Sequence, residues 1–336
     1  YDDRMGWSIG PNRRSANGLY RSGPDAIRVP HEEVAVTVSE GKTAIALVGD
    51  SFTFGEEVRY EETWGYHLGE LLGEGVQILN FGVPGYGVDQ AYLRYERDAR
   101  RWKPKVAIFG VFTHDLLRTL TVYPFLANPQ WDLPFSKPRF MVSDGKSVLL
   151  NDPPLRPEAI FSHESIFELP FHALDRGYKA SNWQTNFYHS SYLFQMFASV
   201  FPGWSAVAPD FSEKAIVLTN ASILKSFALL TAQEDVVPIV VYFPLRSDLN
   251  NGRTSAPPMV IRSMQEAGIA YVDSSLCVLD VNRRDRFMPG GHLTPLANKA
   301  MADCLLPFVR QALRQVAVGR EATMVESLPP TKVLDK

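Results

Sequence analysis

The sequence is poor in the features that mark several protein classes. It holds only two cysteines among 336 residues, Cys277 and Cys304, too few and too far apart to predict a metal site or a disulfide framework. We expect Cys304 to be a small core residue. The longest apolar runs, such as 236–245 with its two prolines, are too short for a helix that spans a membrane. A formal net charge of −3 gives no reason to expect nucleic acid as a partner.

Patterns for a bound metal or nucleotide are also missing. No His, Cys, Asp or Glu cluster has the spacing of metal ligands, so we expect no metal and no cofactor. The glycine-rich segment 80–87 matches neither the dinucleotide-binding G-x-G-x-x-G pattern nor the phosphate-binding G-x-x-x-x-G-K-[ST] pattern. What remains is a globular composition, with 45% apolar residues available for a large core.

Short apolar runs alternate with helical patterns, and this alternation predicts an α/β fold. The expected strands cover 43–48, 76–80, 106–112, 237–243 and 269–272. The expected helices cover 63–72, 88–101, 211–232, 256–267 and 296–313. We therefore predict a flavodoxin-like three-layer α/β/α sandwich with five parallel strands.

The chain divides by composition into five parts. We expect an N-terminal arm over 1–40, a first half of the core over 41–118, an insertion over 119–208, a second half over 209–316 and a loose tail over 317–336. The insertion holds ten of the 20 phenylalanines and three of the six tryptophans. It follows the third strand, so it is expected either to form a lid or pocket wall or to bury an aromatic helix stripe of its own. That stripe would comprise Phe187, Tyr188, Tyr192, Phe194, Phe197 and Phe201.

Ser51 is the best candidate nucleophile. It ends the tripeptide Gly49-Asp50-Ser51 directly after the first strand, and ligands of such sheets bind outside the carboxyl ends of the strands. Asp and Ser after a strand are also ordinary turn and helix-cap residues. The tripeptide therefore needs support from other segments.

Three more segments place polar groups at the same edge. The loop 80–87 is tight enough for its backbone amides to approach a ligand. The third strand ends at Thr113-His114-Asp115. His292 lies in the loop before the last helix, which Thr294 as N-cap and Pro295 at the first position predict.

Taken together, these segments resemble the SGNH/GDSL hydrolase family. The resemblance rests on Gly-Asp-Ser at 49–51, Asn-x-Gly-x-x-Gly at 80–85, the exit of the third strand at 113–115 and His292, and it covers roughly 42–118 and 235–313. It implies that Ser51 attacks an ester carbonyl, that His292 is the general base, and that the amides of Ser51 and Gly82 hold the oxyanion.

Two positions depart from the family pattern. His114 stands where the family usually has an asparagine that donates to the oxyanion, and an imidazole N–H can replace that donor. Pro289 stands where the family usually carries its triad aspartate. Asp285 is the nearest upstream carboxylate, followed by Asp280 and Asp273. The position of Asp285 among three arginines is better explained by a solvated surface carboxylate than by a triad acid. A Ser–His dyad is the remaining alternative.

The resemblance implies a serine ester hydrolase, with O-acyl groups of a carbohydrate among its expected substrates. The alternative within enzymes is a glycan O-acyltransferase, in which a sugar hydroxyl instead of water resolves the acyl-enzyme. An alternative of another class is a non-catalytic carbohydrate-binding module. Because the chain starts at Tyr1, we expect it to be a fragment, and the resemblance implies an extracytoplasmic protein with a signal or anchor upstream.

Overall fold

A computed structural model of the chain supports a description of most of its residues. These are 1–30, 38–128, 131, 133–143, 146–178, 190–200 and 212–326.

The core is a sheet of five parallel strands, as predicted. The strands are β1 (Thr43–Val48), β2 (Val76–Asn80), β3 (Val106–Val111), β6 (Val237–Tyr242) and β7 (Tyr271–Asp273), and their order is β2-β1-β3-β6-β7. The central strands are buried on both faces, which is why their sequences are continuous apolar runs. The chain order reverses between β1 and β3, so the carboxyl ends of these two strands flank the place where such sheets bind ligands.

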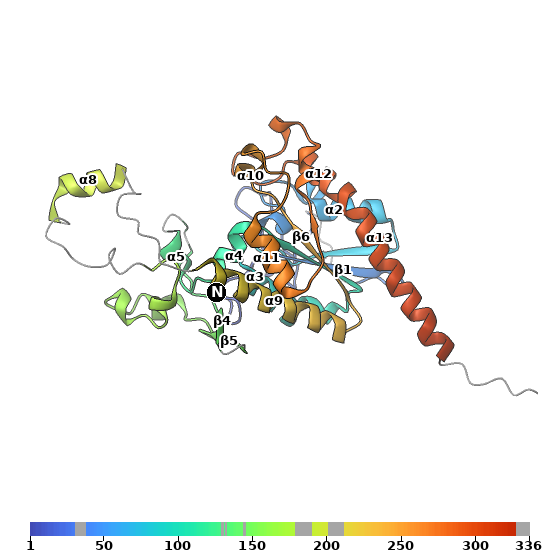
Figure 1. Cartoon of the computed structure of the whole chain (residues 1–336), viewed down its shortest axis with the longest axis horizontal. Helices are drawn as coiled ribbons and strands as arrows, with labels where there is room; N and C mark the ends of the chain where they lie inside the picture. The colour runs from blue at the N-terminus through green and yellow to red at the C-terminus, as the bar shows by residue number, and fades with distance from the viewer. Residues whose placement is uncertain are drawn as a thin grey trace, which may run out of the picture.

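Helices cover both faces of the sheet (Figure 1). On one face lie α3 (Val88–Arg97), α9 (Glu213–Gln233) and α11 (Pro258–Ala267), packed on the core that includes Tyr95, Phe109 and Phe227. On the other face lie α2 (Trp64–Leu72) and α13 (Pro295–Glu326), with Trp64, Met301 and Leu305 in a second core. The three-layer sandwich is confirmed.

The shorter elements lie mostly in the connections. The helices are α1 (Ser51–Phe54), α4 (Thr113–Arg118), α5 (Pro124–Ala127), α6 (Pro157–Ile160), α8 (Tyr192–Val200), α10 (Arg246–Asn250) and α12 (Ser275–Leu279). The 3₁₀ turns are η1 (Tyr60–Glu62), η2 (Ala99–Trp102), η3 (Ile166–Glu168), η4 (His172–Leu174) and η6 (Arg283–Asp285).

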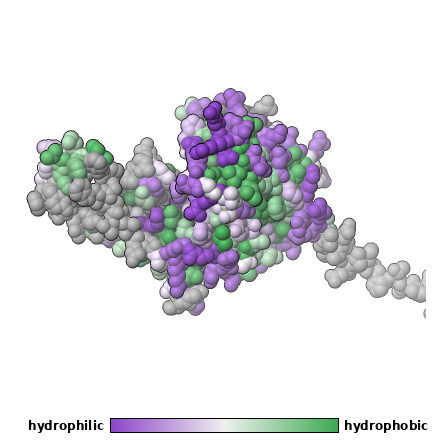
Figure 2. Space-filling model, turned by 45° about the horizontal axis from the view of Figure 1, so that its top comes forward, coloured by the Kyte–Doolittle hydropathy of each residue, from purple (hydrophilic) through white to green (hydrophobic). Residues whose placement is uncertain are grey.

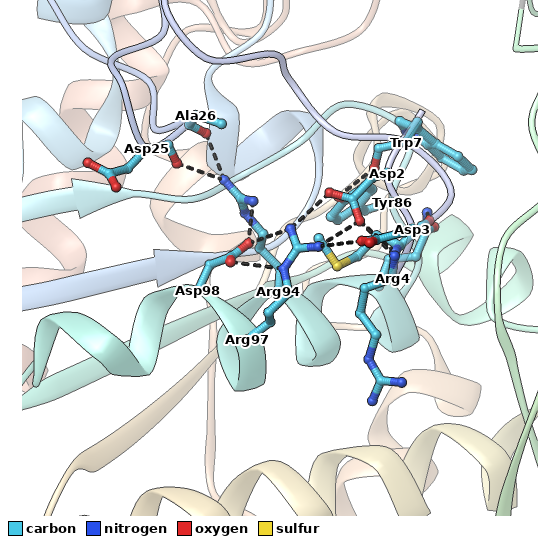
Figure 3. A network of polar contacts seen from close by, with 12 residues as sticks. Asp2, Asp3, Arg4, Trp7, Asp25, Ala26, Tyr86, Arg94, Arg97 and Asp98 are labelled. Carbon is cyan, nitrogen blue, oxygen red and sulfur yellow. Dashed lines mark hydrogen bonds and ion pairs between the residues drawn. The ribbon is translucent and has the colours of Figure 1, made fainter. Parts of the chain in front are cut away.

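The N-terminal arm packs on α3 and on the edge of the sheet. Arg97 on α3 forms an ion pair with Asp2, with Nη2 2.8 Å from Oδ2, and the neighbouring Arg94 donates to the carbonyl of Ala26 (Figure 3). Trp7 is buried against Tyr86, with ring centroids 5.8 Å apart. These contacts hold the arm against α3 and against the loop that precedes it.

The insertion contains a hairpin that the sequence did not predict, β4 (Arg139–Ser143) paired antiparallel with β5 (Lys146–Leu150). The expected buried aromatic stripe is not found on α8, where the side chain of Tyr192 is 87% exposed. Figure 2 shows apolar surface gathered over α8, away from the main body. Phe187, Tyr188 and Phe201 lie outside the described residues.

Two expectations at the C-terminal end are wrong. Cys277 on α12 and Cys304 on α13 form a disulfide, with their Cα atoms 6.0 Å apart. The sequence separation of 27 residues could not show that these two helices pack side by side. The last helix also continues to Glu326, so the predicted loose tail begins as helix.

One described helix, α9, is long and apolar enough to cross a membrane by length and composition alone. Half of its most apolar stretch is buried. Ile223, Leu224 and Phe227 on this helix pack into the sheet core.

Candidate active site

Ser51 begins α1 immediately beyond β1. Asp50 caps this short helix, because its Oδ1 accepts a hydrogen bond from the Phe52 amide at 3.0 Å. The turn requires glycine at Gly49, which has φ +153°, and a Cβ there would lie 2.2 Å from Thr53 Oγ1. Ser51 is thereby fixed at the carboxyl edge of the sheet, where it lines a pocket.

His292 hydrogen-bonds to Ser51 across 241 residues of sequence. Its Nε2 is 2.9 Å from Ser51 Oγ, the distance expected between a nucleophile and its base. The loop that carries His292 leads into α13, and the predicted helix start is confirmed because Thr294 Oγ1 accepts from the Ala297 amide at 3.2 Å. The structure thus brings together the two residues that the sequence singled out.

Glu57 completes the arrangement on the other side of the imidazole. Its Oε2 is 2.8 Å from His292 Nδ1 and 3.1 Å from the His292 amide nitrogen. Its Oε1 accepts from the Gly290 amide at 2.7 Å. Nδ1 facing a carboxylate carries the proton, so Nε2 presents its lone pair to Ser51.

Asp285 does not take this place, which corrects the sequence-based assignment. Asp285 lies in η6 and is exposed. In the part of the chain that the structure describes, no hydrogen bond or ion pair joins its carboxylate to His292; its backbone carbonyl instead accepts from Thr294 Oγ1. The carboxylate that contacts His292 belongs to Glu57, in the segment after α1. Gly55, with φ +75°, reverses the chain before this segment.

Sequence reasoning missed Glu57, although a signal was present. The pair Glu56-Glu57 follows Ser51 within six residues, directly after a glycine that can end a helix. Glu57 itself has φ +68°, a strained conformation for a residue with a side chain, and such conformations cluster at functional sites.

Hydrogen bonds set the pKa of Glu57. Partial burial acts to raise this pKa, but the hydrogen bonds from Gly290 and His292 outweigh burial and lower it overall. Glu57 is therefore ionised at neutral pH, as a carboxylate that supports an imidazolium must be.

Two residues of the N-terminal arm hold the segment that bears Glu57. Arg28 is buried and donates to the carbonyls of Phe54, Gly55 and Val58, the last at 2.6 Å. Tyr20 accepts a hydrogen bond from the Glu57 amide on its hydroxyl oxygen at 2.8 Å. Burial lowers the pKa of Arg28 to about 10, so its guanidinium keeps its charge at neutral pH.

Glu56 faces the pocket beside the reacting pair. Its Oε2 is 3.5 Å from His292 Nε2. Burial raises the pKa of Glu56, and the nearby Asp50 and Glu57 carboxylates add to this effect, while His292 opposes it. A carboxyl of this kind can accept a hydrogen bond from a substrate hydroxyl.

The structure places the expected loop glycine, Gly82, away from the pocket. The Gly82 amide donates to Asn80 Oδ1 at 3.0 Å, and a Cβ on Gly82 would lie 2.4 Å from the Phe54 nitrogen. Gly85 in the same loop lines the pocket instead. Neither the Ser51 amide nor the Gly85 amide donates to another residue in the described ranges, so both are available for an oxyanion.

His114, at the start of α4, also lines the pocket. Burial lowers its pKa, and the positive charges of Arg118 and Arg176 lower it further. Its ring is therefore neutral at neutral pH, with one N–H that can donate.

Two buried carboxylates share one arginine beneath the pocket. Arg118 Nη1 is 3.0 Å from Asp115 Oδ1 and 3.6 Å from Asp50 Oδ2. Burial, together with the Asp50 charge, raises the pKa of Asp115 well above its usual value. Phe112 and Trp131 hold the guanidinium between them, each with its ring centroid 5.0 Å away.

The pocket has a volume of about 700 Å³ and is open to solvent. Trp131 and Leu133 from the insertion form part of its wall. A role as a lid or pocket wall is one of the two expectations for that segment. In the described residues, no group of three His, Cys, Asp or Glu side chains could hold a metal ion.

Comparisons with known proteins find similarity only among solved structures. No family model matches the chain, and no curated protein matches it. A lipase/acylhydrolase from Enterococcus faecalis is 10% identical and has a TM-score of 0.41, covering 80% of this chain and 96% of its own. A member of the lipolytic protein G-D-S-L family from Veillonella parvula is 12% identical, with a TM-score of 0.40 and coverages of 79% and 97%. An acetylxylan esterase from Geobacillus stearothermophilus is 14% identical, with a TM-score of 0.41 and coverages of 81% and 95%.

Proposed function

We propose that this protein is a serine ester hydrolase of the SGNH type. The observation that carries the proposal is the continuous chain of hydrogen bonds from Ser51 Oγ through His292 to Glu57. A hydroxyl, an imidazole and a carboxylate in this order form the arrangement that activates a serine nucleophile.

The reaction follows from the positions of these groups. Ser51 Oγ attacks the ester carbonyl while its proton moves to His292 Nε2, and Glu57 stabilises the resulting imidazolium. The amides of Ser51 and Gly85 receive the oxyanion, with His114 as a third candidate donor. As the carbonyl re-forms, the bond to the alcohol breaks and His292 returns the proton to the leaving oxygen. Water then hydrolyses the acyl-serine by the same steps and releases the acid.

The open pocket suits an ester of a polyhydroxylated alcohol. Glu56, Arg118 and Ser247 line it with hydrogen-bonding groups, while Trp131 supplies an aromatic surface. O-acyl groups of a carbohydrate are therefore the substrates that we propose. A glycan O-acyltransferase would use the same triad, and only the molecule that resolves the acyl-enzyme would differ.

The Cys277–Cys304 disulfide supports an extracytoplasmic location, because disulfides persist mainly in oxidising compartments. We include this location in the proposal.

Labelling with a fluorophosphonate probe tests the serine mechanism. We expect covalent modification of Ser51, with labelling lost in Ser51→Ala and strongly slowed in His292→Ala. Turnover of 4-nitrophenyl acetate should disappear in Ser51→Ala while the circular dichroism spectrum stays unchanged. Absence of labelling in folded wild-type protein would favour the non-catalytic carbohydrate-binding module.

A further inference from the structure

We infer that the ester substrate is an anionic glycan, whose carboxylate or phosphate groups bind a cleft of arginines beside the catalytic pocket. This inference rests on the proposed esterase function and names its substrate class.

The arginine cleft has a volume of about 720 Å³ and adjoins the catalytic pocket. Arg246 and Pro289 line both cavities. The remaining residues of the cleft are Asn250, Arg283, Arg284, Arg286 and Phe287. Four of the seven lining residues are thus arginines and none is acidic, although the chain as a whole has a formal net charge of −3.

Two of these arginines are free to bind a ligand. Arg283 and Arg284 are exposed, and in the described part of the chain neither side chain forms an ion pair or a hydrogen bond. Asp280 and Asp285 are near them in sequence, but neither lines the cleft. In the described residues, the positive charges of Arg283 and Arg284 are therefore not paired with a carboxylate.

The other two arginines, Arg246 and Arg286, fix the position of the loop that carries His292. Arg286 donates to the carbonyls of Val281 and Leu279, each at 2.8 Å. Arg246 donates to the carbonyl of Met288 and lies over the ring of Phe287. A ligand in the cleft would therefore be positioned relative to His292 by the same loop that carries the histidine.

The chemistry of the cleft selects the kind of ligand. Guanidinium groups bind carboxylates and phosphates through paired hydrogen bonds, and a cleft lined by one sign of charge concentrates ions of the opposite sign. Only Phe287 and Pro289 are apolar among the lining residues, so few apolar side chains are present to bind a lipid tail. An acylated polysaccharide with charged groups near the ester fits both cavities.

Matched variants test this inference with three substrates. The double variant Arg283→Gln/Arg284→Gln is compared with Lys214→Gln/Lys225→Gln, which removes two exposed charges from α9. The substrates are O-acetylated polygalacturonate, which is anionic, and O-acetylated xylan and 4-nitrophenyl acetate, which are neutral. We expect the arginine variant to lose about tenfold or more in kcat/KM on the anionic polymer only, and rising salt to weaken the wild-type preference. The lysine variant should match the wild type on all three.

Binding distinguishes the possible anions and does not depend on turnover. Oligogalacturonate binding to Ser51→Ala by calorimetry tests carboxylates, and inorganic phosphate as a competitor tests phosphates. Binding of neither anion, or equal kcat/KM on both polymers, would overturn the inference while leaving the esterase intact. Binding of phosphatidylglycerol vesicles that the arginine variant loses would assign the cleft to a lipid surface and would also overturn it. Absence of 4-nitrophenyl acetate hydrolysis would instead contradict the proposed function.

Discussion

Glu57 hydrogen-bonds to both the ring and the backbone of His292 through a single oxygen, with Oε2 2.8 Å from Nδ1 and 3.1 Å from the amide nitrogen. The same carboxylate therefore fixes the orientation of the imidazole and the path of the loop that carries it. Ser51 and Glu57 come from one short segment of chain, so the nucleophile and the carboxylate are placed relative to each other within that segment.

Replacing Glu57 should damage catalysis far more than replacing Asp285. We expect Glu57→Gln to lower kcat by about 10²- to 10⁴-fold, because an amide cannot stabilise the imidazolium and can favour the wrong tautomer. Asp285→Asn should leave kcat unchanged. Steady-state kinetics on 4-nitrophenyl acetate measure both, and the reverse ranking would restore Asp285 as the acid.

The pH dependence of stability should report the ionisation of Glu57. Its pKa is lowered from 4.5 in the folded protein, so its contribution to the free energy of unfolding is present above about pH 4.5 and is lost as the pH falls through the folded pKa. Urea unfolding at a series of pH values should show a wild-type advantage over Glu57→Gln at neutral pH that shrinks on acidification. A pH-independent difference would contradict this assignment.

Arg28 should act as a positioning residue through Glu57. Arg28→Met leaves the carbonyls of Phe54, Gly55 and Val58 without their donor, so we expect a lower melting temperature and a lower kcat in the folded protein. Arg59→Met, an exposed change on the same segment, is the control. If Arg28 acts through Glu57, its effect on kcat should largely vanish in a Glu57→Gln background. Additive effects on kcat would mean that Arg28 does not act through Glu57.

His114 is expected to be an oxyanion donor. We expect His114→Ala to lower kcat by about 10²- to 10³-fold with a smaller change in KM, and His114→Asn to recover part of the loss. Because its pKa is lowered, this contribution should not vary with pH near neutrality. An unchanged kcat in His114→Ala would leave the oxyanion to the two backbone amides.

The strands and helices that could be predicted are those whose residue pattern lies within the element itself. Val106–Val111 could be recognised as a buried strand because every residue of it is apolar or glycine, and a strand buried on both faces needs such a run. Ser51 and His292 could be recognised because each lies next to a strand or helix with a strong sequence signal. The structure brings Ser51 Oγ and His292 Nε2 to 2.9 Å from each other, because both residues lie at the same edge of the parallel sheet.

The residues that sequence reasoning missed depend on contacts between distant segments. Glu57 reaches His292 only because Gly55 turns the chain and because Arg28 and Tyr20 of the arm hold the turned segment. Gly85 is the candidate oxyanion donor in place of Gly82 because the Gly82 amide already donates to Asn80 Oδ1. No spacing rule contains this information.

The Cys277–Cys304 bond closes a ring of chain, and that ring contains both His292 and the exposed arginines. Ser51 and Glu57 lie outside it. The proton acceptor His292 and the exposed Arg283 and Arg284 of the arginine cleft therefore belong to one covalently closed segment, which packs against the nucleophile and carboxylate supplied by the rest of the fold. Substitutions within this closed segment can then change the substrate preference, while the segment from Ser51 to Glu57 stays the same.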